Sequence, residues 1–148
     1  MNTAIPVGVL GASGYAGREL CGLIARHPRF ELAFATANEQ RGQQLRIGDR
    51  SVTFAAPDDV ALGDAALVFA ALPHGASLPW VVRARSAGAR VVDLSSDLRP
   101  GHGDGSIRAA YGMPELGEAT RAAVHAADIV ANPGCYPTSI LLAIAPLL

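Results

Sequence analysis

Hydrophobic residues in this chain fall into short runs that are separated by turns rich in glycine and proline and by segments with helical spacing. The runs expected to form strands are residues 5–10, 31–37, 51–54, 65–72, 91–94 and 129–131. The segments expected to form helices are residues 18–26, 57–62, 76–87, 118–127 and 139–148. Strands that alternate with helices in this way predict a parallel α/β sheet with right-handed crossover connections.

The composition is that of an ordinary globular protein. The 148 residues suffice for one domain with a hydrophobic core, and the net charge of -1 favours neither nucleic acid nor an anionic membrane as a partner. No apolar run approaches the ~20 residues of a transmembrane helix. The two cysteines lie far apart in the sequence, which predicts neither a disulfide nor a metal site. With no export signal apparent at the N-terminus, we expect a cytoplasmic protein.

Three glycines follow the first expected strand and precede the first expected helix. Gly11, Gly14 and Gly17 form a G-x-x-G-x-x-G turn, with Ser13 and Tyr15 between them. Such a turn lets a dinucleotide pyrophosphate approach the backbone closely at a helix N-terminus. We therefore predict a Rossmann-like, doubly wound, mostly parallel sheet with helices on both faces, and we expect these five residues to contact the cofactor.

The end of the second expected strand bears on the choice of cofactor. NAD-binding domains carry an acidic residue roughly 20 positions after the glycines, where it binds the ribose 2′-hydroxyl. Here the strand ends with Thr36 and Asn38, whereas Glu39 is only near the expected place and Arg41 follows. Neutral groups with a following arginine leave room for a 2′-phosphate. We therefore favour NADP, with Thr36, Asn38 and Arg41 at the cofactor, although an arginine in such a place is more often a solvated loop residue.

A cysteine lies in a turn before the last expected helix, in the stretch Asn-Pro-Gly-Cys-Tyr-Pro-Thr at residues 132–138. Pro137 suits the first turn of a helix, so the thiol of Cys135 is expected at or just before a helix N-terminus. Unpaired amides and the helix dipole favour a thiolate there, which makes a cysteine nucleophilic. The alternative is a small buried core residue, and this is the role we expect for Cys21, which lies on an amphipathic helix.

Several stretches together resemble one enzyme family, N-acetyl-gamma-glutamyl-phosphate reductase of arginine biosynthesis. They are the glycine turn, Leu-Pro-His-Gly at residues 72–75, Val-Asp-Leu-Ser-Ser-Asp-Leu-Arg at 92–99, Tyr-Gly-Met-Pro-Glu at 111–115 and the cysteine stretch. The cysteine stretch is the most specific of these. The related aspartate-semialdehyde dehydrogenases usually carry Asn before the cysteine and Ser or Thr after it, whereas this chain has Gly134 and Tyr136.

The resemblance implies a two-step reduction of an acyl phosphate. The Cys135 thiolate would attack the acyl carbon and expel phosphate, and NADPH would then reduce the thioester to a semialdehyde. Arg99 would bind the substrate phosphate or carboxylate, with Ser95 and Ser96 beside it at a strand end. Alternatively, Arg99 forms a surface salt bridge with Asp97 or Asp104, and the serines cap a turn.

The motif at residues 72–75 implies two further cofactor contacts. Pro73 and His74 would line the nucleotide cleft. The alternative for His74 is a loop histidine that is bonded to backbone, and we favour this over a catalytic role.

The chain also departs from the family. Members are far longer, because a second α+β domain supplies an acid–base histidine and the interface of a homo-oligomer. The expected unit here is one dinucleotide-binding domain over residues 1–148, ending in the helix after Cys135, which alone would bind cofactor but turn over poorly. We expect the apolar residues 140–148 to be covered by another subunit or by further chain. The alternative functions are reduction of aminoadipyl or aspartyl phosphate, or a non-catalytic dinucleotide-binding module.

Overall fold

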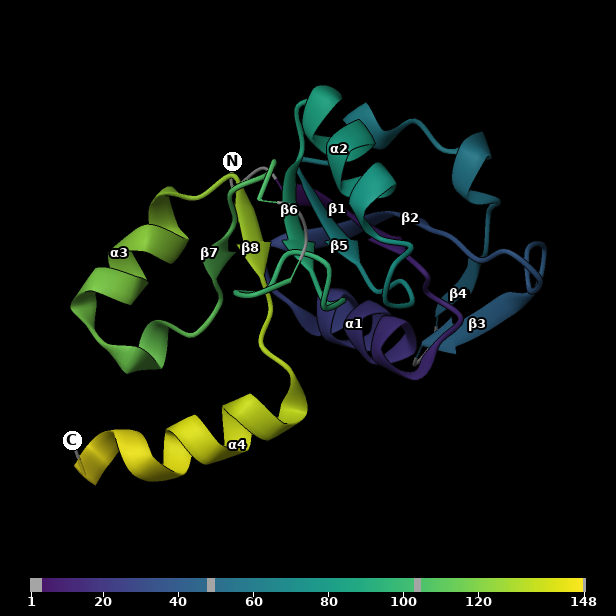
Figure 1. Cartoon of the computed structure of the whole chain (residues 1–148). Coiled ribbons are helices and arrows are strands. Elements are labelled where there is room, and N and C mark those ends of the chain that lie inside the picture. The colour runs from purple at the N-terminus through teal and green to yellow at the C-terminus, as the bar shows by residue number, and fades with distance from the viewer. Residues whose placement is uncertain (1–3, 48–49, 103–104, 148) are drawn as a thin grey trace.

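Six parallel strands form the central sheet (Figure 1), in the order β2-β1-β5-β6-β8-β7. The structure is a computed structural model that describes residues 4–47, 50–102 and 105–147. The strands are β1 (Ile5–Leu10), β2 (Phe30–Ala35), β5 (Leu67–Ala70), β6 (Arg90–Asp93), β7 (Ala110–Tyr111) and β8 (Ile129–Ala131). The chain places β1 and β2 first and then crosses to β5 on the other side of β1. The predicted Rossmann-like sheet is confirmed.

Helices cover both faces of the sheet. Helix α1 (Tyr15–Arg26) lies against β1 and β2 on one face, and α2 (Leu78–Ser86) lies against β5 and β6 on the other (Figure 1). The buried residues of α1 are Gly17, Cys21 and Ile24, whose spacing places them on one side of a helix. Helix α3 (Glu118–Ala126) lies beside the edge strand β7. The edge strand β7 was not predicted, because its two residues carry no strand pattern of their own.

A small antiparallel hairpin is attached to the end of β2. It consists of β3 (Gln44–Ile47) and β4 (Arg50–Thr53). The sequence predicted β4 but not β3, since the polar segment 38–49 was expected to be a loop; residues 48 and 49 lie outside the described part. The N–H of Ala37 donates to the carbonyl of Ala55 at 3.0 Å, and this bond holds the segment after β4 against the segment after β2. Two short 3-10 helices, Pro57–Asp59 and Leu62–Asp64, replace the single helix expected at 57–62.

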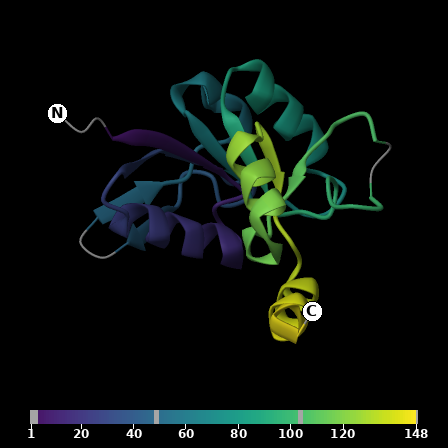
Figure 2. The ribbon, with the colours of Figure 1, turned by 90° about the vertical axis from the view of Figure 1, so that its left-hand side faces the viewer.

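Helix α4 (Cys135–Ile144) stands away from the rest of the domain (Figure 2) and is followed by the 3-10 turn Ala145–Leu147. It begins earlier than the residue 139 that was expected, because Gly134 is extended and its carbonyl accepts the N–H of Thr138 at 3.0 Å. None of its residues is buried, and Ile140 and Leu142 are exposed. Coverage of this surface by other protein stays a prediction. Among the described helices, none combines the length and apolar character that crossing a membrane requires.

Cys21 occupies the core between α1 and the sheet, as predicted. Its relative exposure is 0%, and it belongs to the same buried cluster as Val7, Val9 and Ala35. Burial raises the pKa of this thiol from 9.0 to about 11, since the thiolate loses its hydration there.

The raised pKa of Cys21 makes stability depend on pH in a defined window. The unfolded thiol loses its proton near pH 9.0, while the folded one keeps it to about 11. The free energy of unfolding should therefore fall between these values, by up to about 1.4 kcal/mol per pH unit. Urea unfolding at pH 8, 9.5 and 11 measures this slope, and Cys21→Ala should be flatter by that amount. Equal slopes in both proteins would contradict the assignment.

Candidate functional site

The glycine turn is held so tightly against its neighbours that two positions exclude a side chain. Gly11 has φ +75, and a Cβ there would lie 2.3 Å from the carbonyl oxygen of Ala71. A Cβ on Gly17 would lie 2.3 Å from the carbonyl oxygen of Gly11. The turn is therefore packed directly onto the end of β5 and the start of α1. This is the close approach that a dinucleotide fingerprint requires.

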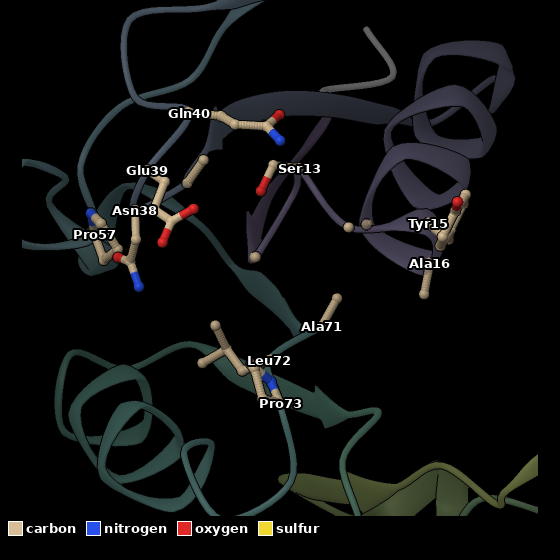
Figure 3. Close-up of a pocket in the computed structure, with 14 residues that line it drawn as sticks. Ser13, Tyr15, Ala16, Asn38, Glu39, Gln40, Pro57, Ala71, Leu72 and Pro73 are labelled. Atoms are coloured by element: carbon tan, nitrogen blue, oxygen red, sulfur yellow. The ribbon is translucent and has the colours of Figure 1, made fainter.

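A pocket of about 450 Å³ opens in front of this turn (Figure 3). It lies beyond the carboxyl ends of the paired strands β1 and β5, whose following helices cover opposite faces of the sheet, and this is the position at which open parallel sheets bind ligands. Seven residues predicted to contact the cofactor line it: Gly11, Ser13, Gly14, Tyr15, Gly17, Asn38 and Pro73. The first turn of α1 also faces this space, so its unpaired amides are available to a pyrophosphate.

Three residues predicted to contact the cofactor do not line the pocket. Thr36 is completely buried, and its hydroxyl accepts the N–H of Gly11 at 3.4 Å, so it supports the turn from beneath. The structure therefore does not support direct contact by the Thr36 side chain. Arg41 is exposed on the loop after β2. His74 is exposed, and its Nδ1 accepts the backbone N–H of Ser96 at 2.9 Å, which is the backbone-bonded alternative.

Sequence reasoning missed several residues of the pocket. Gln40, Pro57 and Ala71 line it and were not singled out. Ala71 follows β5, and its place could have been found from the rule that ligands bind at strand carboxyl ends. The place of Pro57 could not be found from this rule, because Pro57 reaches the pocket only through the hairpin that brings the chain back to the end of β2.

Charged side chains of both signs flank the pocket at the β2 end. Glu39 lines the pocket, and Figure 3 shows its carboxylate directed toward the side where Ser13 lies. The guanidinium of Arg18 donates from Nε to the carbonyl of Ser13 and from Nη2 to Oε1 of Gln40, each at 2.9 Å. Arg18 thus joins the glycine turn to the β2 end at the rim. Glu39, which the sequence places only near the position of the acidic residue in NAD-binding domains, therefore lines the pocket.

A buried polar network shapes the loop after β6. Asp93 and Ser95 both have 0% relative exposure. Asp93 accepts the hydroxyl of Ser77 at 2.6 Å and that of Ser95 at 2.8 Å, and the Ser95 oxygen accepts the N–H of Asp97 at 3.0 Å. The Ser95 side chain therefore has no open surface for a substrate, and the predicted contact is replaced by a structural role. Ser96 is half-buried, so its predicted contact stays a prediction.

Asp97 ties this loop to the start of α2. Its carboxylate accepts the N–H groups of Gly75 at 2.7 Å, Ser77 at 3.0 Å and Leu78 at 3.3 Å. Partial burial acts to raise the pKa of Asp97, but these amides and the Ser95 hydroxyl outweigh it and hold the pKa below its usual value. The Asp97 carboxylate is thus occupied by the amides at the start of α2, and it forms no ion pair with Arg99. Asp104, the other candidate partner of Arg99, lies outside the described residues.

Arg99 joins the loop after β6 to the turn that carries the cysteine. Its Nε donates to the carbonyl of Asn132 and its Nη2 to the carbonyl of Leu94, both at 2.8 Å. The guanidinium therefore spans the carboxyl ends of β6 and β8. It also lies against Gly134, where an added Cβ would be 3.1 Å from Nη1.

Cys135 is the first residue of α4 and is exposed. Its predicted placement at a helix start is confirmed. It follows β8 at the same edge of the parallel sheet at which the glycine turn follows β1, so the exposed thiol and the pocket at the glycine turn share one edge. In the described part of the chain, no three His, Cys, Asp or Glu side chains gather closely enough to hold a metal ion.

Comparison with known proteins agrees with this arrangement. The family model for the NAD-binding domain of semialdehyde dehydrogenase matches residues 6–124. N-acetyl-gamma-glutamyl-phosphate reductases from Salinispora arenicola and Moorella thermoacetica are 44% and 38% identical over 97% of this chain, and each match covers 47% of the relative. Aspartate semialdehyde dehydrogenase II from Vibrio cholerae has the same fold, with a TM-score of 0.82 at 23% identity over 98% of this chain and 42% of that one.

These matches confirm the resemblance that the motifs indicated. The chain spans about half the length of the curated relatives that it matches. The match to the family model covers most of the chain, from β1 into α3. This chain therefore belongs to the semialdehyde dehydrogenase family and contains its NAD-binding domain.

Proposed function

We propose that this chain is the cofactor-binding and nucleophile-bearing part of an N-acetyl-gamma-glutamyl-phosphate reductase. The reaction would convert N-acetyl-gamma-glutamyl phosphate to N-acetylglutamate semialdehyde with release of phosphate, a step of arginine biosynthesis. The observation that carries this proposal is the exposed thiol of Cys135 at the start of α4, on the edge of the sheet that also bears the pocket. The relatives of this name are about twice as long, so turnover is proposed for a cytoplasmic homo-oligomer that also contains the family's second domain.

Acyl transfer would use the residues at the β6 and β8 ends. The Cys135 sulfur would attack the acyl carbon, a C–S bond would form, and the C–O bond to phosphate would break to leave a thioacyl enzyme and free phosphate. Two N–H groups of Arg99 already bond to the carbonyls of Asn132 and Leu94. The remaining donors of the guanidinium suit the phosphate or carboxylate of the substrate. Ser96, which is half-buried in the loop after β6, is the second residue proposed to contact the substrate.

The pocket at the glycine turn would hold the nicotinamide cofactor. When bound, the cofactor supplies the hydride that reduces the thioester. The amides at the start of α1 would bind the pyrophosphate, and Pro73 would form the wall toward the cysteine side. Because Nδ1 of His74 accepts a backbone N–H, its Nε2 carries the proton and is a donor at the edge of the cleft.

We propose NADPH as the reductant, with Arg18 at the rim of the pocket and Arg41 on the loop after β2 as the cations that would attract its 2′-phosphate. Arg18 is fixed at the rim of the pocket by Ser13 and Gln40. NADH is a second candidate, because the carboxylate of Glu39 lines the pocket and would accept ribose hydroxyls while repelling a 2′-phosphate.

The placement of Cys135 weighs against the alternative of a non-catalytic binding module, which has no use for an exposed thiol at a helix start. The choice among N-acetylglutamyl, aminoadipyl and aspartyl phosphate rests on the names of the relatives, which favour the first.

The acyl-transfer proposal predicts that Cys135, and not Cys21, becomes acylated. Incubation with N-acetyl-gamma-glutamyl phosphate without cofactor should add one acyl group to the peptide that contains Cys135, as measured by mass spectrometry. Cys135→Ser should abolish the adduct and lower reductase activity by at least about a thousandfold, with dinucleotide affinity unchanged within about twofold. Cys21→Ala is the matched control and should still be acylated. An adduct that persists in Cys135→Ser would contradict the assignment.

Titration with NADPH and NADH, followed by cofactor fluorescence, tests the cofactor proposal. We expect NADPH to bind more tightly than NADH, and Glu39→Gln to strengthen NADPH binding by about three- to tenfold because it removes a like charge. NADH affinity should fall slightly or stay constant in the same variant. Tighter binding of NADH by the unaltered protein would overturn the choice of NADPH and make NADH the reductant.

A further inference from the structure

We infer that Arg99 and Gly134 act as a pair that positions Cys135 and keeps an uncompensated positive charge beside it. The guanidinium fastens the cysteine turn to the end of β6, and the missing side chain at position 134 lets the guanidinium lie against that turn. Arg99 is thus a positioning residue in addition to any contact that it makes with substrate. This inference deepens the proposed function and rests on Cys135 as the nucleophile.

The first support is the pair of hydrogen bonds that Arg99 makes to backbone. The carbonyls of Leu94 and Asn132 belong to segments that directly follow β6 and β8, and each accepts a guanidinium N–H at 2.8 Å. Asn132 is only three residues before Cys135 and is anchored from the other side, since its N–H donates to the carbonyl of Asp93 at 2.8 Å. The chain between β8 and α4 is therefore bonded twice to the β6 segment before the thiol is reached.

The second support is that no carboxylate among the described residues pairs with the Arg99 guanidinium. Arg99 is half-buried and forms no ion pair with any acidic group in the described ranges. The nearby carboxylate of Asp97 is turned toward the amides at the start of α2. Both groups that Arg99 bonds are neutral carbonyls, so its charge remains available at the first turn of α4, where an anionic sulfur would lie.

The third support is that Gly134 has no backbone reason to be glycine. Its φ of -72 and ψ of 165 suit any residue. The constraint comes from its neighbour, because a Cβ there would lie 3.1 Å from Nη1 and 3.7 Å from Cζ of Arg99. An added methyl group would therefore force the guanidinium to shift by a few tenths of an ångström. Glycine at this position is therefore explained by the approach of the arginine.

Together these observations give the pair a defined task. The two hydrogen bonds fix where α4 begins and hence where the Cys135 sulfur points, while the adjacent charge stabilises the thiolate and draws an anionic acyl phosphate toward it. A purely structural arginine would do only the first of these. The test must therefore report the charge at the sulfur separately from the integrity of the turn.

Alkylation of Cys135 by two reagents of similar size but different charge provides such a test. Iodoacetate is an anion and iodoacetamide is neutral, so the ratio of their rate constants reports the local potential at the sulfur. Arg99→Gln should lower this ratio by about five- to tenfold, and Arg99→Lys should keep it within about threefold because it retains the charge. Gly134→Ala should lower it by a smaller factor, about 1.5- to twofold, because the guanidinium is still present but is shifted from the turn. Labelling sites are identified by peptide mass spectrometry.

Arg26→Gln is the matched control, because it removes one exposed arginine at the far end of α1 and should leave the ratio unchanged. An unchanged ratio in both Arg99→Gln and Gly134→Ala would overturn the inference. If Arg99→Gln does not fold, Gly134→Ala decides the inference alone, because a ratio equal to that of the unaltered protein would overturn it. Dinucleotide binding is measured on the same samples, and loss of all binding by the unaltered protein would refute the proposed function and not the pairing of Arg99 with Gly134.

Discussion

Hydrogen bonds from charged side chains to backbone groups hold together the loops at the carboxyl edge of the sheet, and the candidate site depends on them. Asp97 binds the loop after β6 to the start of α2, and Arg99 binds the same loop to the turn after β8. Hydrogen bonds to charged groups contribute roughly 1.5–3 kcal/mol each, more than those between neutral groups. The segments after β5, β6 and β8 are thus fixed to one another across the sheet.

The consequence for function is a continuous connection from the pocket to the thiol. Pro73 lines the pocket, His74 beside it accepts the N–H of Ser96, and Arg99 in the same loop reaches the turn of Cys135. Neither the pocket nor the cysteine turn needs to be shaped by the other directly. The middle segment would therefore set how a bound dinucleotide and the sulfur face each other, which the proposed reduction through an enzyme-bound thioester requires.

Periodicity and turn residues predicted most of the fold and the positions of the glycine turn and of Cys135, and the failures have physical reasons. The glycine turn and the cysteine at a helix start were found because both depend on glycine and proline residues that can be recognised in the sequence itself. Strand β3 was missed because its short polar sequence gains its structure only by pairing with β4. Thr36 and Ser95 were expected at ligands, but burial places both beneath the loops, where hydroxyl groups satisfy backbone amides. Such burial depends on long-range packing that a local pattern does not contain.

The most direct test of the account is whether the nicotinamide end of a bound dinucleotide covers Cys135. The rate of Cys135 alkylation by iodoacetamide is measured without ligand, with saturating cofactor, and with 2′-phospho-ADP-ribose, which lacks the nicotinamide. We predict that the complete cofactor slows alkylation strongly and that the truncated nucleotide, although bound, does not. Full alkylation of Cys135 while the complete cofactor is bound would show that the pocket and the thiol do not share one active site.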